Sequence, residues 1–185
     1  MGIKKVKTRP SNAYRFLHPM HTVLVTCGKA SEENIITLAW AMPTSINPPL
    51  IAMSVRPTRH SYKLIKETQE FVVNVPPIDI VKETLFCGRC SGKTYDKFKE
   101  TKLTPLPAKA VKTSIIKECV AHLECKLKQT FATGDHDIFV GEVIEAYANE
   151  DSFKDEFDIG KARLIYHVGG NKFVTLSDKM IEPSL

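Results

Sequence analysis

Apolar and polar residues alternate one by one over a long stretch in the second half of the chain. Between residues 120 and 129 (VAHLECKLKQ), every second side chain from Ala121 to Leu127 is apolar, and the side chains between them are polar. A repeat of two is typical of an antiparallel strand with one buried face. A turn at 133–137 (TGDHD) and an apolar run at 137–148 complete a long predicted β-hairpin.

Shorter runs of Val, Ile and Thr, each bounded by turn residues, predict further strands. These runs cover residues 21–28, 34–42, 49–55 and 71–77. A final hairpin is predicted within 162–176, where the chain turns at Gly169 and Gly170.

Two segments are helical in character. In residues 59–70 (RHSYKLIKETQE), a stripe of side chains from Tyr62 to Gln69 faces one way, and Lys and Glu occupy the rest. Residues 78–103 also favour a helix, which glycines interrupt. Mostly antiparallel strands with two or three helices predict a mainly β fold, a β-barrel with helical insertions.

Length and composition fit a soluble globular protein. The 185 residues are enough for one domain over 1–185, which could bury roughly two thirds of its unfolded surface. The longest apolar runs fall short of the ~20 residues that span a bilayer. The basic start, MGIKKVKTRPSNAYRF, lacks the apolar stretch of a signal peptide. We therefore expect a cytoplasmic protein without a membrane partner.

The net charge of +5 is modest, and the lysines are spread along the chain. No zinc-finger spacing or RNP-like aromatic motif supports a nucleic-acid partner, so none is predicted. A smaller anion such as a phosphate suits this charge.

A candidate phosphate site lies at the predicted start of the first helix. Arg56 and Arg59 flank Pro57, and His60 and Ser61 follow. Exposed backbone N–H groups at a helix start favour an anion, and arginine adds paired hydrogen bonds. The alternative is an ordinary helix cap with solvated basic side chains.

The strand TLAWAMPTS holds Trp40, the only tryptophan of the chain. The small residues Ala39 and Ala41 on either side would let a flat ring system lie close to the backbone. Hydrogen-bonding groups near the ends of the strand come from Asn34, Thr37, Thr44 and Ser45. The alternative is a core strand with a packed tryptophan.

The five cysteines are an odd number, which argues against a secreted disulfide framework. Cys27, Cys119 and Cys125 fall in apolar runs and are expected to be buried thiols in a reducing compartment.

Cys87 and Cys90 form a CxxC motif with Arg89 inside it, which allows a redox dithiol because a cation lowers a thiol pKa. No strand precedes this motif, and no second CxxC completes a zinc site, so no metal is predicted. The overlapping GRCSGKT stretch has three residues between its glycines, where a P-loop has four, so a triphosphatase is excluded.

Several segments, in their order along the chain, resemble the flavin reductase-like family of FMN-binding split barrels. They are HTVLVTCG, NIITLAWAMPTSINPPLIAMSVRP, FVVNVP, FCGRCSGKTYDKF, and the pair AHLECKL with GDHDIFVGEV. The resemblance runs from about residue 14 to residue 150 and is closest to the flavoredoxin and archaeal ferric reductase type. It implies a Greek-key split β-barrel, a homodimer, and FMN near the subunit interface.

The resemblance also implies which residues bind FMN. One strand would line the isoalloxazine ring and ribityl chain with Thr37, Leu38, Ala39, Trp40, Ala41, Met42, Pro43 and Thr44. The phosphate end would meet Ser54, Val55, Arg56, His60 and Ser61. Residues beside the flavin or closing its site would be Asn74, Val75, Asp96, Lys97 and Phe98. His136, in the family's GDH segment, would face the flavin where a nicotinamide or another partner docks.

The chain departs from the family pattern at two places. Many members carry Ser and a small residue where this chain has Ala39 and Trp40, so Trp40 would stack on the flavin ring or narrow access to it. Cys90 is not a regular feature of the family. Both departures affect which electron partner is expected, and neither changes the expectation that the chain binds a flavin.

The predicted function is that of an FMN-binding oxidoreductase. It would pass electrons from NAD(P)H through the flavin N5 to a flavin, ferric or protein acceptor, while backbone N–H groups and Lys97 stabilise the reduced flavin. No dinucleotide fingerprint distinguishes NADH from NADPH, or shows that either is used. The alternatives are a non-enzymatic FMN carrier or storage protein and a thiol redox protein that uses Cys87 and Cys90.

Overall fold

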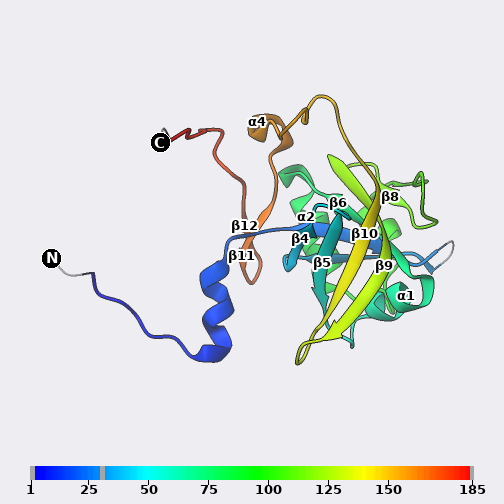
Figure 1. Ribbon diagram of the computed structural model, residues 1–185, viewed down its shortest axis with the longest axis horizontal. Helices are drawn as coiled ribbons and strands as arrows, with labels where there is room; N and C mark the ends of the chain where they lie inside the picture. The colour runs from blue at the N-terminus through cyan, green and yellow to red at the C-terminus, as the bar shows by residue number, and fades with distance from the viewer. Residues whose placement is uncertain (1–2, 30–31, 184–185) are drawn as a thin grey trace.

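A seven-stranded antiparallel sheet forms the body of the molecule (Figure 1). The computed structural model describes residues 3–29 and 32–183. The strands lie in the order β3-β2-β6-β9-β10-β5-β4, and every neighbouring pair is antiparallel. Their bounds are β2 Val23–Cys27, β3 Asn34–Leu38, β4 Ala41–Ser45, β5 Leu50–Val55, β6 Glu70–Val75, β9 Ala121–Ala132 and β10 Asp137–Ala148. The predicted mainly β fold is confirmed.

Short helices and two small sheets surround this body. The helices are α1 His60–Thr68, α2 Val81–Arg89, α3 Lys97–Thr101 and α4 Ile159–Ala162, with 3-10 turns η1 Pro10–Leu17 and η3 Ile78–Ile80. One small sheet pairs β1 Met20–His21 with β11 Tyr166–Gly169, which continues to β12 Lys172–Val174. The other pairs β7 Pro105–Leu106 with β8 Ile115–Ile116.

The strand predicted at 34–42 is in fact two strands, because the chain leaves the sheet at Ala39 and Trp40. β3 ends at Leu38 and β4 begins at Ala41, and they lie at opposite edges of the sheet. A two-residue link can join opposite edges only if the sheet curls so that they approach each other. The backbone N–H of Ser54 donates to the carbonyl of Trp40 at 2.9 Å, which fixes the link against β5.

The other sequence expectations are largely confirmed. The β9–β10 hairpin and the β11–β12 hairpin form where predicted, and α1 falls within the helix expected at 59–70. The helix expected over 78–103 is divided: α2 passes through Gly88 and stops at Arg89, and α3 starts only at Lys97.

Both chain ends lie on one side of the barrel. In Figure 1, η1 and the β11–β12 hairpin are side by side, because β1 pairs with β11 just after η1. Within the described residues, no helix is long and apolar enough to cross a membrane.

The polar face of β9 is exposed at Lys126 and Lys128, as its alternation predicts, but it is buried at His122 and Glu124. Glu124 is fully buried, and its carboxylate accepts hydrogen bonds from the backbone N–H groups of Lys109, Ala110 and Val111 at 2.8, 2.6 and 3.1 Å. The Tyr147 hydroxyl donates to it at 2.8 Å. Burial alone would raise the pKa of Glu124, but these hydrogen bonds outweigh it and lower the pKa. One carboxylate thus holds the loop between β7 and β8 on the sheet.

Replacing this carboxylate should destabilise the fold. Glu124→Ala leaves three N–H donors and one hydroxyl without their acceptor, so we expect a loss of about 3 kcal/mol in the free energy of unfolding at neutral pH. Because the folded pKa is lowered, the wild-type contribution is present above the unfolded pKa of about 4.3 and is lost as pH falls through the folded pKa. Urea unfolding across this pH range measures both effects. The exposed Glu67→Ala is the control, with an expected change below about 0.5 kcal/mol, and an equal loss in both variants would contradict the assignment.

Candidate functional site

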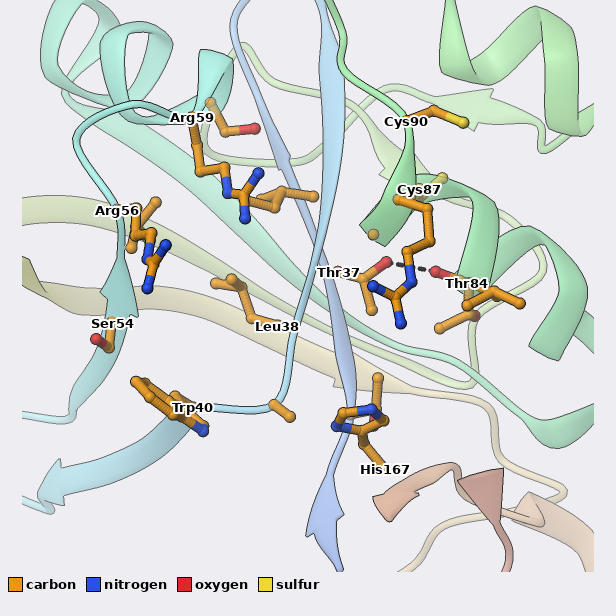
Figure 2. Close-up of a pocket in the computed structure, with 18 of the residues that line it drawn as sticks. Thr37, Leu38, Trp40, Ser54, Arg56, Arg59, Thr84, Cys87, Cys90 and His167 are labelled. Carbon is orange, nitrogen blue, oxygen red and sulfur yellow. Dashed lines mark hydrogen bonds between the residues drawn. The ribbon is translucent and has the colours of Figure 1, made fainter. Parts of the chain in front are cut away.

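A cavity of about 450 Å³ opens beside β3, where the curled sheet meets the two longer helices (Figure 2). Its wall includes β3 with the Ala39–Trp40 link, the end of β5, the start of α1, and the C-terminal half of α2 with the loop after it. Side chains from η1, from the β9–β10 turn and from the β11–β12 hairpin complete it. Figure 2 shows Arg56 and Arg59 on one side of β3, and Thr84, Cys87 and Cys90 on the other.

The start of α1 forms a cationic end of the cavity. Arg59 is the N-cap residue, and no side chain caps the first backbone N–H groups of the helix. Arg56 pairs with the exposed Asp135 at 2.5 Å, whereas no described carboxylate pairs with Arg59. Burial, followed by nearby lysines, lowers the pKa of His60, so the positive charge at neutral pH comes from the arginines. Uncapped N–H groups beside arginines make an anion-binding site.

The charge of the cavity is one-sided. Among the described residues that line it, four are basic and none is Asp or Glu. The basic residues are the arginines Arg56, Arg59 and Arg89, and the buried Lys97. A ligand that fits this wall is therefore an anion.

Lys97 is a buried cation that ties α3 to the wall. Its side chain is 4% exposed, and its Nζ donates to the carbonyls of Ile35 at 2.5 Å and Cys87 at 2.7 Å. Burial lowers the pKa of Lys97. The ammonium is held between β3 and α2, with a third N–H left for another acceptor.

Two buried polar atoms of the cavity wall have no hydrogen-bond partner within the described structure. Asn34 donates through Nδ2 to Ser61 Oγ at 2.7 Å, but its Oδ1 is unpaired. Thr84 accepts from Thr37 Oγ1 through its carbonyl at 2.6 Å, while its own hydroxyl is unpaired. Buried groups of this kind cost free energy unless they are paired, so both atoms are available to a polar ligand or to water.

Glycines let α2 and the following loop approach β3 closely. A Cβ at Gly88 would lie 3.1 Å from the Cβ of Thr37, and a Cβ at Gly92 would collide with the side chain of Asn34. These positions bring Thr84 and Cys90 to the cavity.

The structure brings most of the predicted site residues together at this cavity. Those that line it are Thr37, Leu38, Ala39, Trp40, Ser54, Val55, Arg56, His60, Ser61, Lys97 and His136. Trp40 and His136 are in contact, with ring centroids 5.0 Å apart.

Other predicted residues lie away from the cavity. Met42, Pro43 and Thr44 are exposed on β4, because the chain has already crossed to the opposite edge of the sheet, and Ala41 packs on the core. The side chain of Asn74 is fully buried, where it donates to the Leu24 carbonyl and accepts from the Ile116 N–H. The remaining three have structural places: Val75 in the core, Phe98 against Leu24 and its neighbours, and Asp96 at the N-cap of α3.

Several wall residues were not predicted to belong to the flavin site. From α2 and its loop these are Thr84, Leu85, Gly88, Arg89, Cys90, Ser91 and Gly92, and from the chain ends Tyr14, His18, Thr22, His167, Gly170 and Phe173. The two glycines in GRCSG were a usable signal for close approach to a ligand. No local pattern marks the residues from the chain ends, because long-range pairing of β1 with β11 brings them in.

The structure does not support a reactive dithiol at Cys87 and Cys90. Cys87 is 1% exposed, and burial raises its pKa to about 12, so its thiolate is scarce at neutral pH. All five cysteines are free thiols. No group of three or more His, Cys, Asp or Glu in the described part of the chain is placed to hold a metal ion.

Known proteins share this architecture. A family model described as "Flavin reductase like domain" matches residues 14–174. A protein of Archaeoglobus fulgidus, described only as uncharacterized, is 36% identical over 93% of this chain and 97% of its own length. A protein of Streptomyces nodosus subsp. asukaensis, named NADH-dependent FMN reductase AsuE2, is 24% identical over 88% of this chain and 81% of its own length.

Solved structures agree with the family match. Flavoredoxin from Methanosarcina acetivorans superposes with a TM-score of 0.86 and 28% identity, over 97% of this chain and 95% of that chain. A protein from Shewanella frigidimarina described as having a split barrel domain shares the fold, with a TM-score of 0.84 and 18% identity over the whole of both chains. The predicted split barrel and family resemblance are confirmed: the chain belongs to the flavin reductase like family.

Proposed function

We propose that this protein is an oxidoreductase that holds FMN in the cavity and passes electrons from a reduced nicotinamide to an acceptor. The chain belongs to a flavin reductase like family, and FMN-binding proteins are among the solved structures that share its fold. The observation that carries the placement is the anion-binding end of the cavity. Uncapped N–H groups of α1 lie there beside Arg59, in a wall without described carboxylates.

The flavin phosphate lies at the start of α1 in this proposal. Backbone N–H groups and Arg59 donate to the phosphate oxygens, and Ser61, already ordered by Asn34, lies alongside. Arg56 contributes less, because Asp135 already neutralises part of its charge.

The flavin ring system lies along β3 and the Ala39–Trp40 link. There the unpaired Asn34 Oδ1 and Thr84 hydroxyl would find polar partners on the ligand. Bound FMN supplies the hydride and electron transfer, and the protein supplies position and charge. The Lys97 side chain favours negative charge in the cavity, and His136, whose ring contacts that of Trp40 at a tilt of 43°, faces the docking partner.

The proposed electron donor is NADH or NADPH, which the name of the Streptomyces relative supports. The acceptor would be a flavin, a ferric compound or a protein. We further propose a cytoplasmic homodimer. Free cysteines suit a reducing compartment, and exposed apolar side chains near η1 and β4 suit a subunit contact, with Leu17 at 71% exposure and Ile46 at 95%.

Similarity to flavoredoxin favours a second candidate function. In this alternative the protein is a non-enzymatic FMN carrier that stores electrons or relays them between larger partners.

Removing the phosphate anchor should weaken FMN binding selectively. We expect Arg59→Gln to raise the Kd for FMN by about tenfold or more, the loss of a charge-assisted hydrogen bond, and to leave the Kd for riboflavin unchanged because riboflavin lacks the phosphate. Flavin fluorescence titration measures both constants. Lys63→Gln, on the same helix but outside this cavity, is the matched control and should change neither. Purified protein that shows no flavin absorbance and binds no added FMN would refute the proposed function.

Steady-state oxidation of NADH and NADPH distinguishes the two candidate functions. The reductase should turn over either nucleotide with free flavin or a ferric chelate as acceptor, at a rate that depends on bound FMN. The carrier would keep its FMN but exchange electrons only with a protein partner, so the absence of steady-state oxidation of either nucleotide with these acceptors would support the carrier.

Exchange of both cysteines of the CxxC tests the thiol alternative. We expect the Cys87→Ser, Cys90→Ser double variant to keep its FMN and its turnover within about threefold, because a thiol with a pKa of about 12 is not a working nucleophile. Abolished turnover in a folded, yellow double variant would favour the dithiol mechanism.

A further inference from the structure

A continuous wall of aromatic and imidazole rings forms one end of the cavity. Its members, in order of contact, are His136, Trp40, Tyr14, His18, His167 and Phe173, and all of them line the cavity. We call this set the ring wall. Successive ring centroids are 5.0, 5.6, 6.0, 5.3 and 5.3 Å apart. In Figure 2, Trp40 and His167 lie away from the end that holds Arg59.

The ring wall offers flat apolar faces and edges to a ligand. Aromatic rings bind other rings by offset or edge contacts, which add to the burial of apolar surface. A cavity of about 450 Å³ that must also hold FMN leaves space at the ring wall for a small molecule only. These dimensions select a small aromatic compound.

His18 gives the ring wall a fixed hydrogen-bond acceptor. Its Nδ1 lies 2.9 Å from the backbone carbonyl of His167, and because a carbonyl only accepts, Nδ1 carries the proton. In the neutral ring Nε2 is then an acceptor. This Nε2 is buried and has no partner among the described residues. A hydroxyl or N–H group of a ligand would satisfy it.

Arg89 gives the same end of the cavity a fixed cation. Its Nη2 donates to Asn171 Oδ1 at 2.6 Å, so the β11–β12 turn holds the guanidinium at the hairpin side of the cavity. One of its five N–H groups is used there, and no described carboxylate pairs with it. The guanidinium can therefore bind the carboxylate or sulfonate of a ligand with paired hydrogen bonds.

We propose that the ring wall, Arg89 and His18 together form a binding site for small aromatic acids that carry a hydroxyl or N–H donor. The ring of the acid stacks on the wall, its anionic group binds Arg89, and its donor bonds His18 Nε2. This assignment rests on the proposed FMN site and makes such acids the substrate class of the oxidoreductase. An acid of this class that carries a quinone group besides its hydroxyl or N–H donor would take up two electrons and two protons from the reduced cofactor and leave as the hydroquinone.

Matched naphthalene probes test the site by calorimetric titration of the FMN-loaded oxidised protein. The reference probe is 6-hydroxy-2-naphthoate; 6-hydroxy-2-naphthamide lacks its charge, and 6-methoxy-2-naphthoate lacks its donor. We expect each loss to weaken binding about tenfold, the effect of one charge-assisted or buried hydrogen bond. Arg89→Gln should abolish the preference for 6-hydroxy-2-naphthoate over the naphthamide. His18→Leu should abolish the preference for 6-hydroxy-2-naphthoate over the methoxy compound.

The control variant is Arg163→Gln, which removes a charge from a residue outside the cavity and should keep both preferences. FMN affinity is measured for every variant, and it should stay within about threefold of wild type if Arg89 and His18 serve the acid rather than the cofactor. Equal affinity for the three probes, preferences that survive both substitutions, or a matching loss of FMN affinity would overturn the inference. Wild-type protein that binds no FMN refutes the proposed function instead, and the same probe series on that protein still decides on the ring wall.

Discussion

The two-residue link at Ala39 and Trp40 is the constraint on which the rest of the structure depends. It joins β3 and β4, which lie at opposite edges of one sheet, and so forces the sheet to close on itself. The closure leaves the backbone of β3 beside the end of β5 and the start of α1. Without it, Arg59 and the unpaired polar atoms of Asn34 and Thr84 would not share a cavity.

A second layer of contacts holds α2 against β3 from the other side. Gly88 permits the close approach, the Thr37 hydroxyl bonds the Thr84 carbonyl, and the Lys97 ammonium bridges the two elements. The two carbonyl oxygens replace part of the water that the Lys97 side chain loses, although burial still lowers its pKa. The contact that secures the fold therefore also places a basic donor at the cavity.

Local periodicity was sufficient for the β9–β10 hairpin and for α1, and the order of the segments was sufficient for the family. Local periodicity could not reveal that the strand predicted at 34–42 ends before Ala39 and that a second strand begins after Trp40, because every residue around Ala39 suits a strand. Asn74 was placed beside the flavin by the family resemblance alone. In the structure its amide is buried, where it donates to the Leu24 carbonyl and accepts from the Ile116 N–H. Burial of Glu124 likewise depends on a loop more than ten residues away in sequence, which no period of two encodes.

The ring wall also could not be predicted from local sequence patterns, because its residues are far apart in the sequence and meet only in the folded chain. Its members come from both ends of the chain and from two turns, and only the pairing of β1 with β11 brings the ends together. Each residue alone looks like an ordinary surface aromatic or histidine. Chemistry assembled across the whole length of a chain in this way has no signature in any short window of sequence.

The position of Trp40 has a practical consequence. It is the only tryptophan of the chain, it lines the cavity, and it is 36% exposed. Nearly all of the tryptophan-type fluorescence of this protein therefore originates at the wall of the cavity. An isoalloxazine absorbs in the same spectral range, so cofactor loading would quench that emission by energy transfer. The molecule contains its own optical reporter of occupancy, with no background from a second indole.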